Sequence, residues 1–162
     1  MKKLISAALI SMFIVFAVSA NAGPFEDSAA AIERKDYVTA AKLMRVAADQ
    51  GNAQAQSNLG FMYGDGQGVT QDYKEAVKWY RLAADQGNAD ADYNLGAMYA
   101  NGQGVTQDYV RAHMWWNIAA SSGNTLAESY RDKVAKMMTQ TQIEKAQDMA
   151  RRCQSSNFKN CG

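Results

Sequence analysis

An internal repeat of 36 residues restricts the folds open to this chain more than any other feature of its sequence. The segment AADQGN at 47–52 returns unchanged at 83–88, and a looser copy, AASSGN, follows at 119–124. Residues 47–73 and 83–109 are identical at 21 of 27 aligned positions. Periods of roughly 20–50 residues form arrays in which each unit buries its apolar face against its neighbours. The repeat therefore predicts a stacked, elongated fold.

Each unit has the pattern of two helices. In the first helix Ala, Leu and Tyr recur at intervals of four, which places them on one face. The positions are Ala55, Leu59 and Tyr63, and then Ala91, Leu95 and Tyr99. A glycine follows each leucine, at Gly60 and Gly96. Glycine costs about 1 kcal/mol of helix propensity, so we expect a neighbouring helix to come close there.

The second helix of the unit is predicted to begin at Asp72, an N-cap residue, with Glu75 completing a capping-box pattern. Its buried stripe includes Trp79 and Tyr80, and the next copy has Trp115 and Trp116 in the same places. Gly51, Gly87 and Gly123 fit the left-handed residue that ends such helices. With no β-type alternation, the pattern predicts an all-α class built of stacked helix pairs.

The chain divides into five expected segments. Lys2 and Lys3, an apolar run and then Ala20-Asn21-Ala22 predict a signal peptide over 1–22, cleaved after Ala22. The run is shorter than the ~20 residues that span a bilayer, so we expect no stable membrane insertion. The remaining segments are an opening helical pair (23–51), two full repeats (52–87 and 88–123) and a C-terminal helical cap (124–162). Export to the periplasm or the exterior follows from this interpretation.

Cys153 and Cys161 are the two cysteines of the chain, and both lie near its end. In an exported chain two cysteines normally pair, so we expect a disulfide that staples the end of the last helix. Their spacing fits neither a C-x-x-C redox motif nor a zinc ligand pair. Losing Lys2 and Lys3 takes the formal net charge from +1 to about −1, which disfavours nucleic acid as a partner. We expect no cofactor and no metal.

From Ala55 to Gly87 the pattern resembles a Sel-1-like repeat, a relative of the tetratricopeptide repeat. The second copy, Ala91 to Gly123, matches with Trp116 in place of Tyr80. The resemblance implies a right-handed α-solenoid of antiparallel helix pairs. It also implies an adaptor or scaffold that binds a protein or peptide, in the bacterial envelope or on a host protein. A cysteine-rich branch of the family binds or hydrolyses β-lactams. This sequence has no disulfide within each repeat, so that activity remains only an alternative, carried by analogy.

The candidate binding surface is the face of the first helices that lines the inner surface of the curved stack, opposite their buried Leu, Gly and Tyr positions. The predicted positions are Ser57, Phe61 and Asp65 in one repeat and Tyr93, Ala97 and Asn101 in the next. They vary between the copies while the core positions stay fixed, which suits a surface adapted to a partner. Random sequence change at unconstrained surface positions would give the same variation between the copies. Phe61 and Tyr93 are the expected anchors, because aromatic side chains dominate interface energetics.

No residue is predicted to be catalytic. His113 is the single histidine of the chain, and Val77 and Ala41 occupy its position in other copies, which favours packing. The local sequence places no Asp, Glu or Cys to orient it or to be activated by it. Trp115 and Trp116 are expected in the core. Asp90 and Asp92 lie two apart on a helix, so their side chains diverge and are expected to be solvated.

Overall fold

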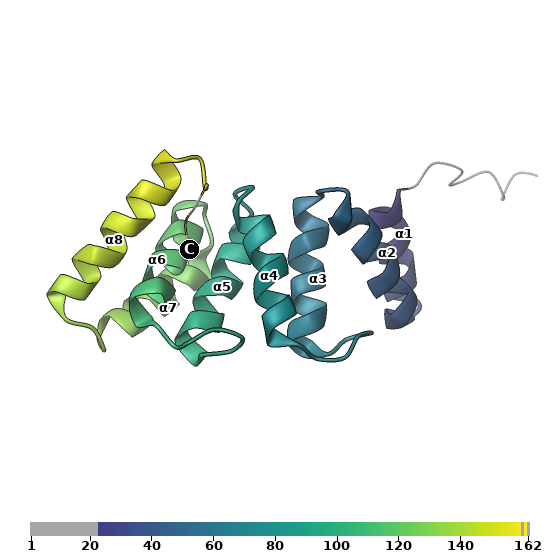
Figure 1. Cartoon of the computed structure of the whole chain (residues 1–162), viewed down its shortest axis with the longest axis horizontal. Helices are drawn as coiled ribbons and strands as arrows, with labels where there is room; N and C mark the ends of the chain where they lie inside the picture. Colours follow the sequence, from purple (N-terminus) through teal and green to yellow (C-terminus); the bar gives the residue numbers. More distant parts are fainter. Residues whose placement is uncertain (1–22, 160, 162) are drawn as a thin grey trace, which may run out of the picture.

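The computed structural model describes residues 23–159 and 161, and within this part the chain is entirely helical (Figure 1). The helices are α1 (Pro24–Glu33), α2 (Tyr37–Asp49), α3 (Ala53–Asp65), α4 (Tyr73–Ala84), α5 (Ala89–Asn101), α6 (Tyr109–Ser121), α7 (Thr125–Ala135) and α8 (Gln140–Ser155). They follow one another along the longest axis of the molecule, with α1 near one end and α8 near the other.

The helices associate as consecutive pairs. Helix α1 packs on α2, α3 on α4 and α5 on α6, and each pair packs on the next through α2 with α3 and α4 with α5. Beyond the third pair the pattern changes, because both α7 and α8 pack against α6. The expected all-α solenoid is confirmed.

Side-chain caps fix where the helices begin. Asn52, Asn88 and Asn124 each accept a hydrogen bond from the amide three residues on, at 2.8–2.9 Å. Asp72 caps α4 as expected, accepting from the amides of Lys74 and Glu75. The reciprocal half of the predicted capping box is not formed, since the Glu75 carboxylate instead pairs with Lys78 Nζ at 3.4 Å. A complete capping box opens α8, where Thr139 and Gln142 bond each other's backbone amides.

The glycines after the leucines mark where the two helices of a pair come closest. A Cβ atom placed on Gly60 would lie 2.7 Å from Cδ1 of the Tyr80 ring. On Gly96 it would lie 2.5 Å from Cδ1 of Trp116. Both rings are buried. The expectation that glycine permits close helix packing is confirmed. The group that packs against each glycine is the aromatic ring of the second helix.

A second glycine contact joins neighbouring pairs. The loop after each first helix folds back onto the start of the preceding second helix. Gly68 (φ 75°) lies against the carbonyl of Tyr37, and Gly104 (φ 72°) against that of Tyr73. A side chain would collide with the backbone there, and the positive φ also favours glycine. The loops therefore fix the register between units.

The C-terminal tail is tied back onto the stack. Cys153 and Cys161 form the expected disulfide. Phe158, within the closed loop, packs on the core, and its ring lies beside Gly87 in the turn between α4 and α5. The segment predicted to be a signal peptide lies outside the described residues. None of the described helices is long and apolar enough to cross a membrane.

Replacing Gly60 by alanine should lower the free energy of unfolding by about 1–3 kcal/mol, because the new methyl group would overlap the buried Tyr80 ring. Gly64→Ala in the same helix is the matched control. Its Cβ would make ordinary contacts with Met98 and Ala76, and alanine already stands at the equivalent Ala100. That variant should be stabilised by up to about 1 kcal/mol. Urea denaturation followed by circular dichroism measures both, and equal effects would contradict the close-packing argument.

Candidate interaction surface

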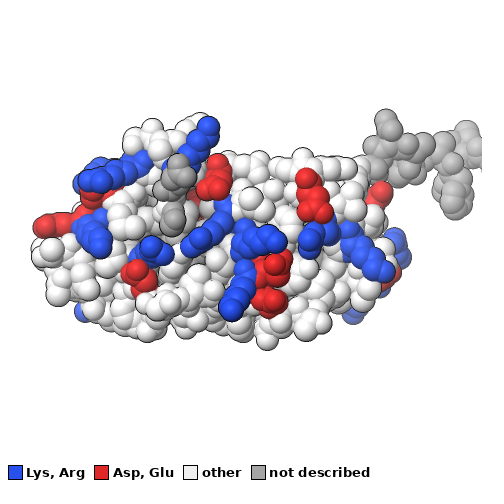
Figure 2. All heavy atoms as spheres, viewed as in Figure 1, with Lys and Arg blue, Asp and Glu red and all other residues white. Residues whose placement is uncertain are grey.

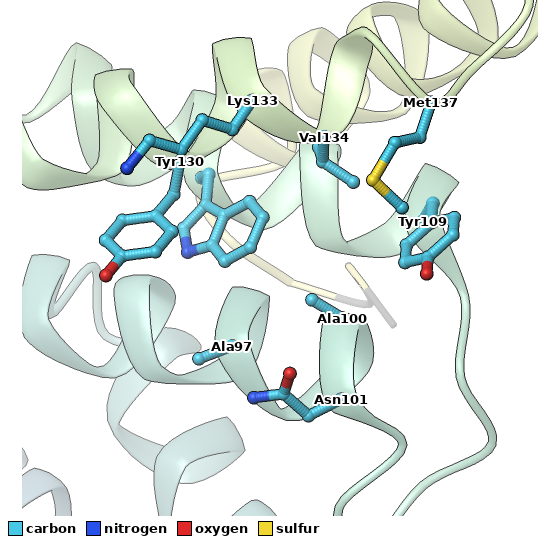
Figure 3. A pocket seen from close by; sticks show the side chains of 9 residues that line it. Ala97, Ala100, Asn101, Tyr109, Tyr130, Lys133, Val134 and Met137 are labelled. Carbon is cyan, nitrogen blue, oxygen red and sulfur yellow. The ribbon is translucent and has the colours of Figure 1, made fainter.

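A groove of about 280 Å³ opens between α5, α6 and α7, and we call it the aromatic groove (Figure 3). Its lining residues are Ala97, Ala100, Asn101, Tyr109, Trp116, Tyr130, Lys133, Val134 and Met137. Figure 3 shows the Tyr130 ring and the Met137 side chain descending from the upper wall, with Ala97, Ala100 and Asn101 below them. Most of this lining is apolar, and no Asp or Glu belongs to it.

Helix α7 positions the upper wall. It begins after Asn124 just as α3 and α5 begin after Asn52 and Asn88, so the three helices share one register. In α7, however, Arg131 and Asp132 replace the Leu-Gly pair. These two side chains form an ion pair with each other at 2.8 Å. No close-packed ring can lie on Asp132 as it does on the glycines, so this helix face stays uncovered by a following partner helix.

Three aromatic rings form one end of the groove. Trp116 lies on Gly96 and, on its other side, 5.5 Å from the ring of Tyr130, measured between centroids. Tyr93 meets the same Tyr130 edge to face at 5.9 Å. The indole Nε1 of Trp116 donates to the Tyr93 carbonyl at 3.1 Å, so α5 holds it. Such offset and edge-to-face pairs attract each other, so the three rings pack together as one aromatic cluster.

The rim of the groove carries its polar groups. Lys133 Nζ lies 4.8 Å from the centroid of the Tyr130 ring, and it makes no ion pair within 4.0 Å in the described part of the chain. Asn101 is exposed at the opposite edge. Met137 is 61% exposed and Tyr130 40%, large values for apolar side chains. The groove can therefore take an apolar side chain while its rim binds a backbone or a carboxylate.

The structure separates the six predicted surface residues. Ala97 and Asn101 line the aromatic groove, and Tyr93 contacts it through Tyr130. Phe61, 51% exposed, and Asp65 are on the surface but outside this groove. Ser57 is 3% exposed, which contradicts its expected exposure. It lies one turn before Gly60, on the side of α3 that α4 approaches, so packing covers it.

Sequence reasoning missed most of the groove. The lining residues that the sequence did not predict as surface are Ala100, Tyr109, Trp116, Tyr130, Lys133, Val134 and Met137. Trp116 was expected in the core, and it is buried, yet it also forms part of the groove wall. The sequence feature that could have indicated the groove was the replacement of the Leu-Gly pair by Arg131 and Asp132. A unit that breaks the packing rule marks the place where the apolar face of its neighbour stays open.

Asp92 corrects another expectation, because it is buried and not solvated. Its side chain is 0% exposed, and both carboxylate oxygens lack a hydrogen-bond partner among the described residues. Burial, together with the smaller effect of the negative charge of Asp85, raises the pKa of this carboxyl to about 8. Gln56 occupies the same position one repeat earlier, where its Nε2 donates to the Ala48 carbonyl at 3.1 Å. A protonated Asp92 can donate in that way, and a carboxylate cannot.

The groups that could suggest catalysis do not meet. His113 is buried on α6, and its Nδ1 has no partner within the described segments. Burial lowers the pKa of this imidazole, with a further lowering from Arg131 against a raising by Asp132. Ser57 lies on α3, and no hydrogen bond joins it to His113. Residues 23–159 and 161 contain no cluster of His, Cys, Asp or Glu suited to a metal ion.

Comparison with known proteins assigns the repeats. The family model for the Sel1 repeat matches residues 28–52, 53–88 and 89–124, which together make up more than half of the chain. No sequence among curated proteins matches at a significant level.

Two solved structures share the fold. One is c5321, a protective antigen present in uropathogenic Escherichia coli strains displaying an SLR fold, with a TM-score of 0.77 and 29% sequence identity. The match covers 83% of this chain and 31% of that one. The other is a Sel1 repeat protein from Oxalobacter formigenes, with a TM-score of 0.64, 33% identity and coverage of 68% and 44%. The chain thus spans less than half the length of either protein.

Asp92 should make the protein less stable as the pH rises. The unfolded chain releases this proton near pH 4, whereas the folded chain keeps it to about pH 8. Between those values the free energy of unfolding should fall by up to about 1.4 kcal/mol per pH unit. Asp92→Asn should flatten the slope and stabilise the protein at pH 8. Urea denaturation from pH 5 to pH 8 measures this, and equal slopes for the two proteins would refute the assignment.

Proposed function

The chain belongs to the Sel1 repeat family, and from that premise we propose that it is an adaptor that binds a protein partner through the aromatic groove. Proteins built of Sel1 repeats generally mediate protein–protein interactions. The observation that carries the proposal is the open apolar wall formed by Trp116, Tyr130 and Met137. Aromatic and methionine side chains are enriched at interfaces, where they dominate the binding energy.

The occupant that fits the groove is an apolar side chain on a surface segment of the partner. Ala97 and Ala100 form the floor and leave the space beneath the rings empty. Lys133 and Asn101 at the rim supply a positive charge and an amide to hold the polar backbone or an acidic neighbour of that side chain. Because the groove lies where the repeat pattern ends, the partner would cover the face that no further helix pair covers.

We place this adaptor in the bacterial envelope or outside the cell, where it meets an envelope protein or a host protein. Two features support this location. The first 22 residues have the layout of a secretory signal, and the Cys153–Cys161 disulfide suits an oxidising compartment. The likeness to c5321, a protective antigen, agrees with a protein met outside the cytoplasm.

Ala97→Phe should abolish binding of the partner. Phe61 occupies the equivalent position one repeat earlier, so the substitution copies a side chain that this helix type already carries, but here the ring would fill the groove. We expect recovery of the partner to fall at least tenfold, which is about 1.4 kcal/mol of binding free energy. Site-specific photocrosslinking from Asn101 in an envelope fraction, quantified by mass spectrometry, measures the recovery.

The matched control is Phe61→Ala, which removes an exposed ring outside the groove. It should leave recovery unchanged, while circular dichroism shows that both variants fold. Full binding by the Ala97→Phe protein would refute the groove. Loss of binding in Phe61→Ala alone would move the contact to the exposed face of α3 that carries Phe61.

A further inference from the structure

A second surface repeats itself along the stack. One groove of about 340 Å³ lies between α2 and the loop after α3, and another of about 460 Å³ lies between α4 and the loop after α5. Lys42, Arg45 and Val69 line the first, and Lys78, Arg81 and Val105 line the second. These residues occupy the same positions one repeat apart. We call the pair the basic grooves.

The lining of the basic grooves carries only positive charge, although acidic side chains flank it: Asp49 pairs with Arg45 at 3.3 Å, and Glu75 pairs with Lys78 at 3.4 Å. Five basic side chains line them, namely Lys42, Arg45, Lys74, Lys78 and Arg81, and no Asp or Glu is among the lining residues of either. Figure 2 shows Lys and Arg side chains gathered over α4 and α2, with acidic groups beside those of α4. The formal net charge of the chain is only +1, so this concentration is local. It creates a field that attracts a negatively charged partner.

Bonds within the stack hold the arginines in place. Arg45 Nη1 donates to the hydroxyl of Tyr63 at 3.3 Å, and its guanidinium lies 4.8 Å from the centroid of the Trp79 ring. Arg81 repeats the first contact by donating to the Tyr99 hydroxyl at 2.5 Å. A guanidinium has five N–H donors, so further donors remain for a ligand. An arginine fixed in advance loses less entropy when it binds.

The lysines leave charge available. Lys42 and Lys74 make no ion pair within 4.0 Å among the residues that the structure describes. Lys78 pairs with Glu75 at 3.4 Å, but with 57% of its side chain exposed this pair is weak. An incoming carboxylate can therefore bind these ammonium groups without first displacing a strong internal partner.

Each groove also offers an apolar contact. Val69 and Val105 follow the glycines whose loops lie against the carbonyls of Tyr37 and Tyr73. Both valines are half-buried and pack against the hydrophobic core of the stack. Each groove thus combines an apolar wall with cations, and the combination recurs one repeat later.

We propose that the basic grooves bind an extended acidic polypeptide segment of a protein partner. Its apolar side chains would lie against Val69 and Val105, and its Asp or Glu side chains would pair with the lysines and arginines between them. This surface is formed by α2, α4, part of α3 and the loops after α3 and α5, and it shares no lining residue with the aromatic groove. It adds a second binding site and a stated chemistry of partner.

Fluorescence anisotropy tests this with labelled peptides of glutamates that contain two leucines at variable separation. The wild-type protein should bind the best of them, and raising the ionic strength from about 0.02 M to 0.3 M should weaken binding several-fold, as screening requires. The double variant Lys42→Glu/Lys78→Glu should lose at least tenfold in affinity. Peptides with glutamine in place of glutamate should bind the wild type no better than this variant binds the acidic ones.

Lys145→Glu/Lys159→Glu is the matched control, because it makes the same change of net charge at exposed residues outside the grooves. It should keep wild-type affinity. An equal loss of affinity would show that net charge alone explains the effect, and it would overturn the proposal. Val69→Thr/Val105→Thr preserves shape and removes the apolar walls. It should weaken the leucine peptides, and no change would overturn the apolar contact.

Two more outcomes would contradict the proposal. Tighter binding of a single-stranded DNA oligonucleotide than of any peptide would assign the surface to another polyanion. Loss of peptide binding in Ala97→Phe would place the peptide in the aromatic groove instead. Because the two sites use different residues, failure of either leaves the test of the other intact.

Discussion

In each complete repeat an aromatic ring of the second helix lies directly on a glycine of the first, and the rest of the structure depends on this contact. Tyr80 on Gly60 and Trp116 on Gly96 set how closely the helices of a pair approach. Helix α7 has Asp132 at the equivalent position, so α8 does not form the same pair with α7 and packs against α6. The aromatic groove lies on α6 and α7, together with α5, next to this departure from the repeat pattern.

The contacts between units are equally periodic, and they explain why a surface can recur. A loop glycine lies on the preceding helix start, and an arginine donates to the tyrosine of the next unit. In the last copy of this arrangement Asn117 and Ala135 replace the arginine and the tyrosine. The basic grooves therefore end before α7. One end of the array has charged, repeated grooves and the other has a single apolar groove, which suits partners of different chemistry.

The features fixed by local rules could be predicted from the sequence. Helix class, the N-caps, the glycine contacts and the disulfide each rest on a short pattern and a known physical cause. The direction in which each side chain points was harder to predict, because an internal helix of a solenoid has neighbours on two or three sides. If each helix is assumed to bury only one face, Ser57 and Asp92 are expected to be exposed, but both are buried. The aromatic groove needs Tyr130 from α7 and Met137 from the turn after it. Because this segment departs from the repeat, comparing the copies could not locate the groove.

Position 92 shows how one substitution within a regular array changes its energetics. The same place holds Gln56 in the preceding repeat and Glu128 in α7. Gln56 is buried and bonded, and the carboxylate of Glu128 reaches solvent with 62% of its side chain exposed. Asp92 is buried without a partner, so only its protonated form is well tolerated. In a solenoid each unit contacts only its neighbours, so the cost of ionisation falls on the contact between α4 and α5. That contact joins the basic grooves to the aromatic groove, and its strength decides how rigidly the two surfaces are held together.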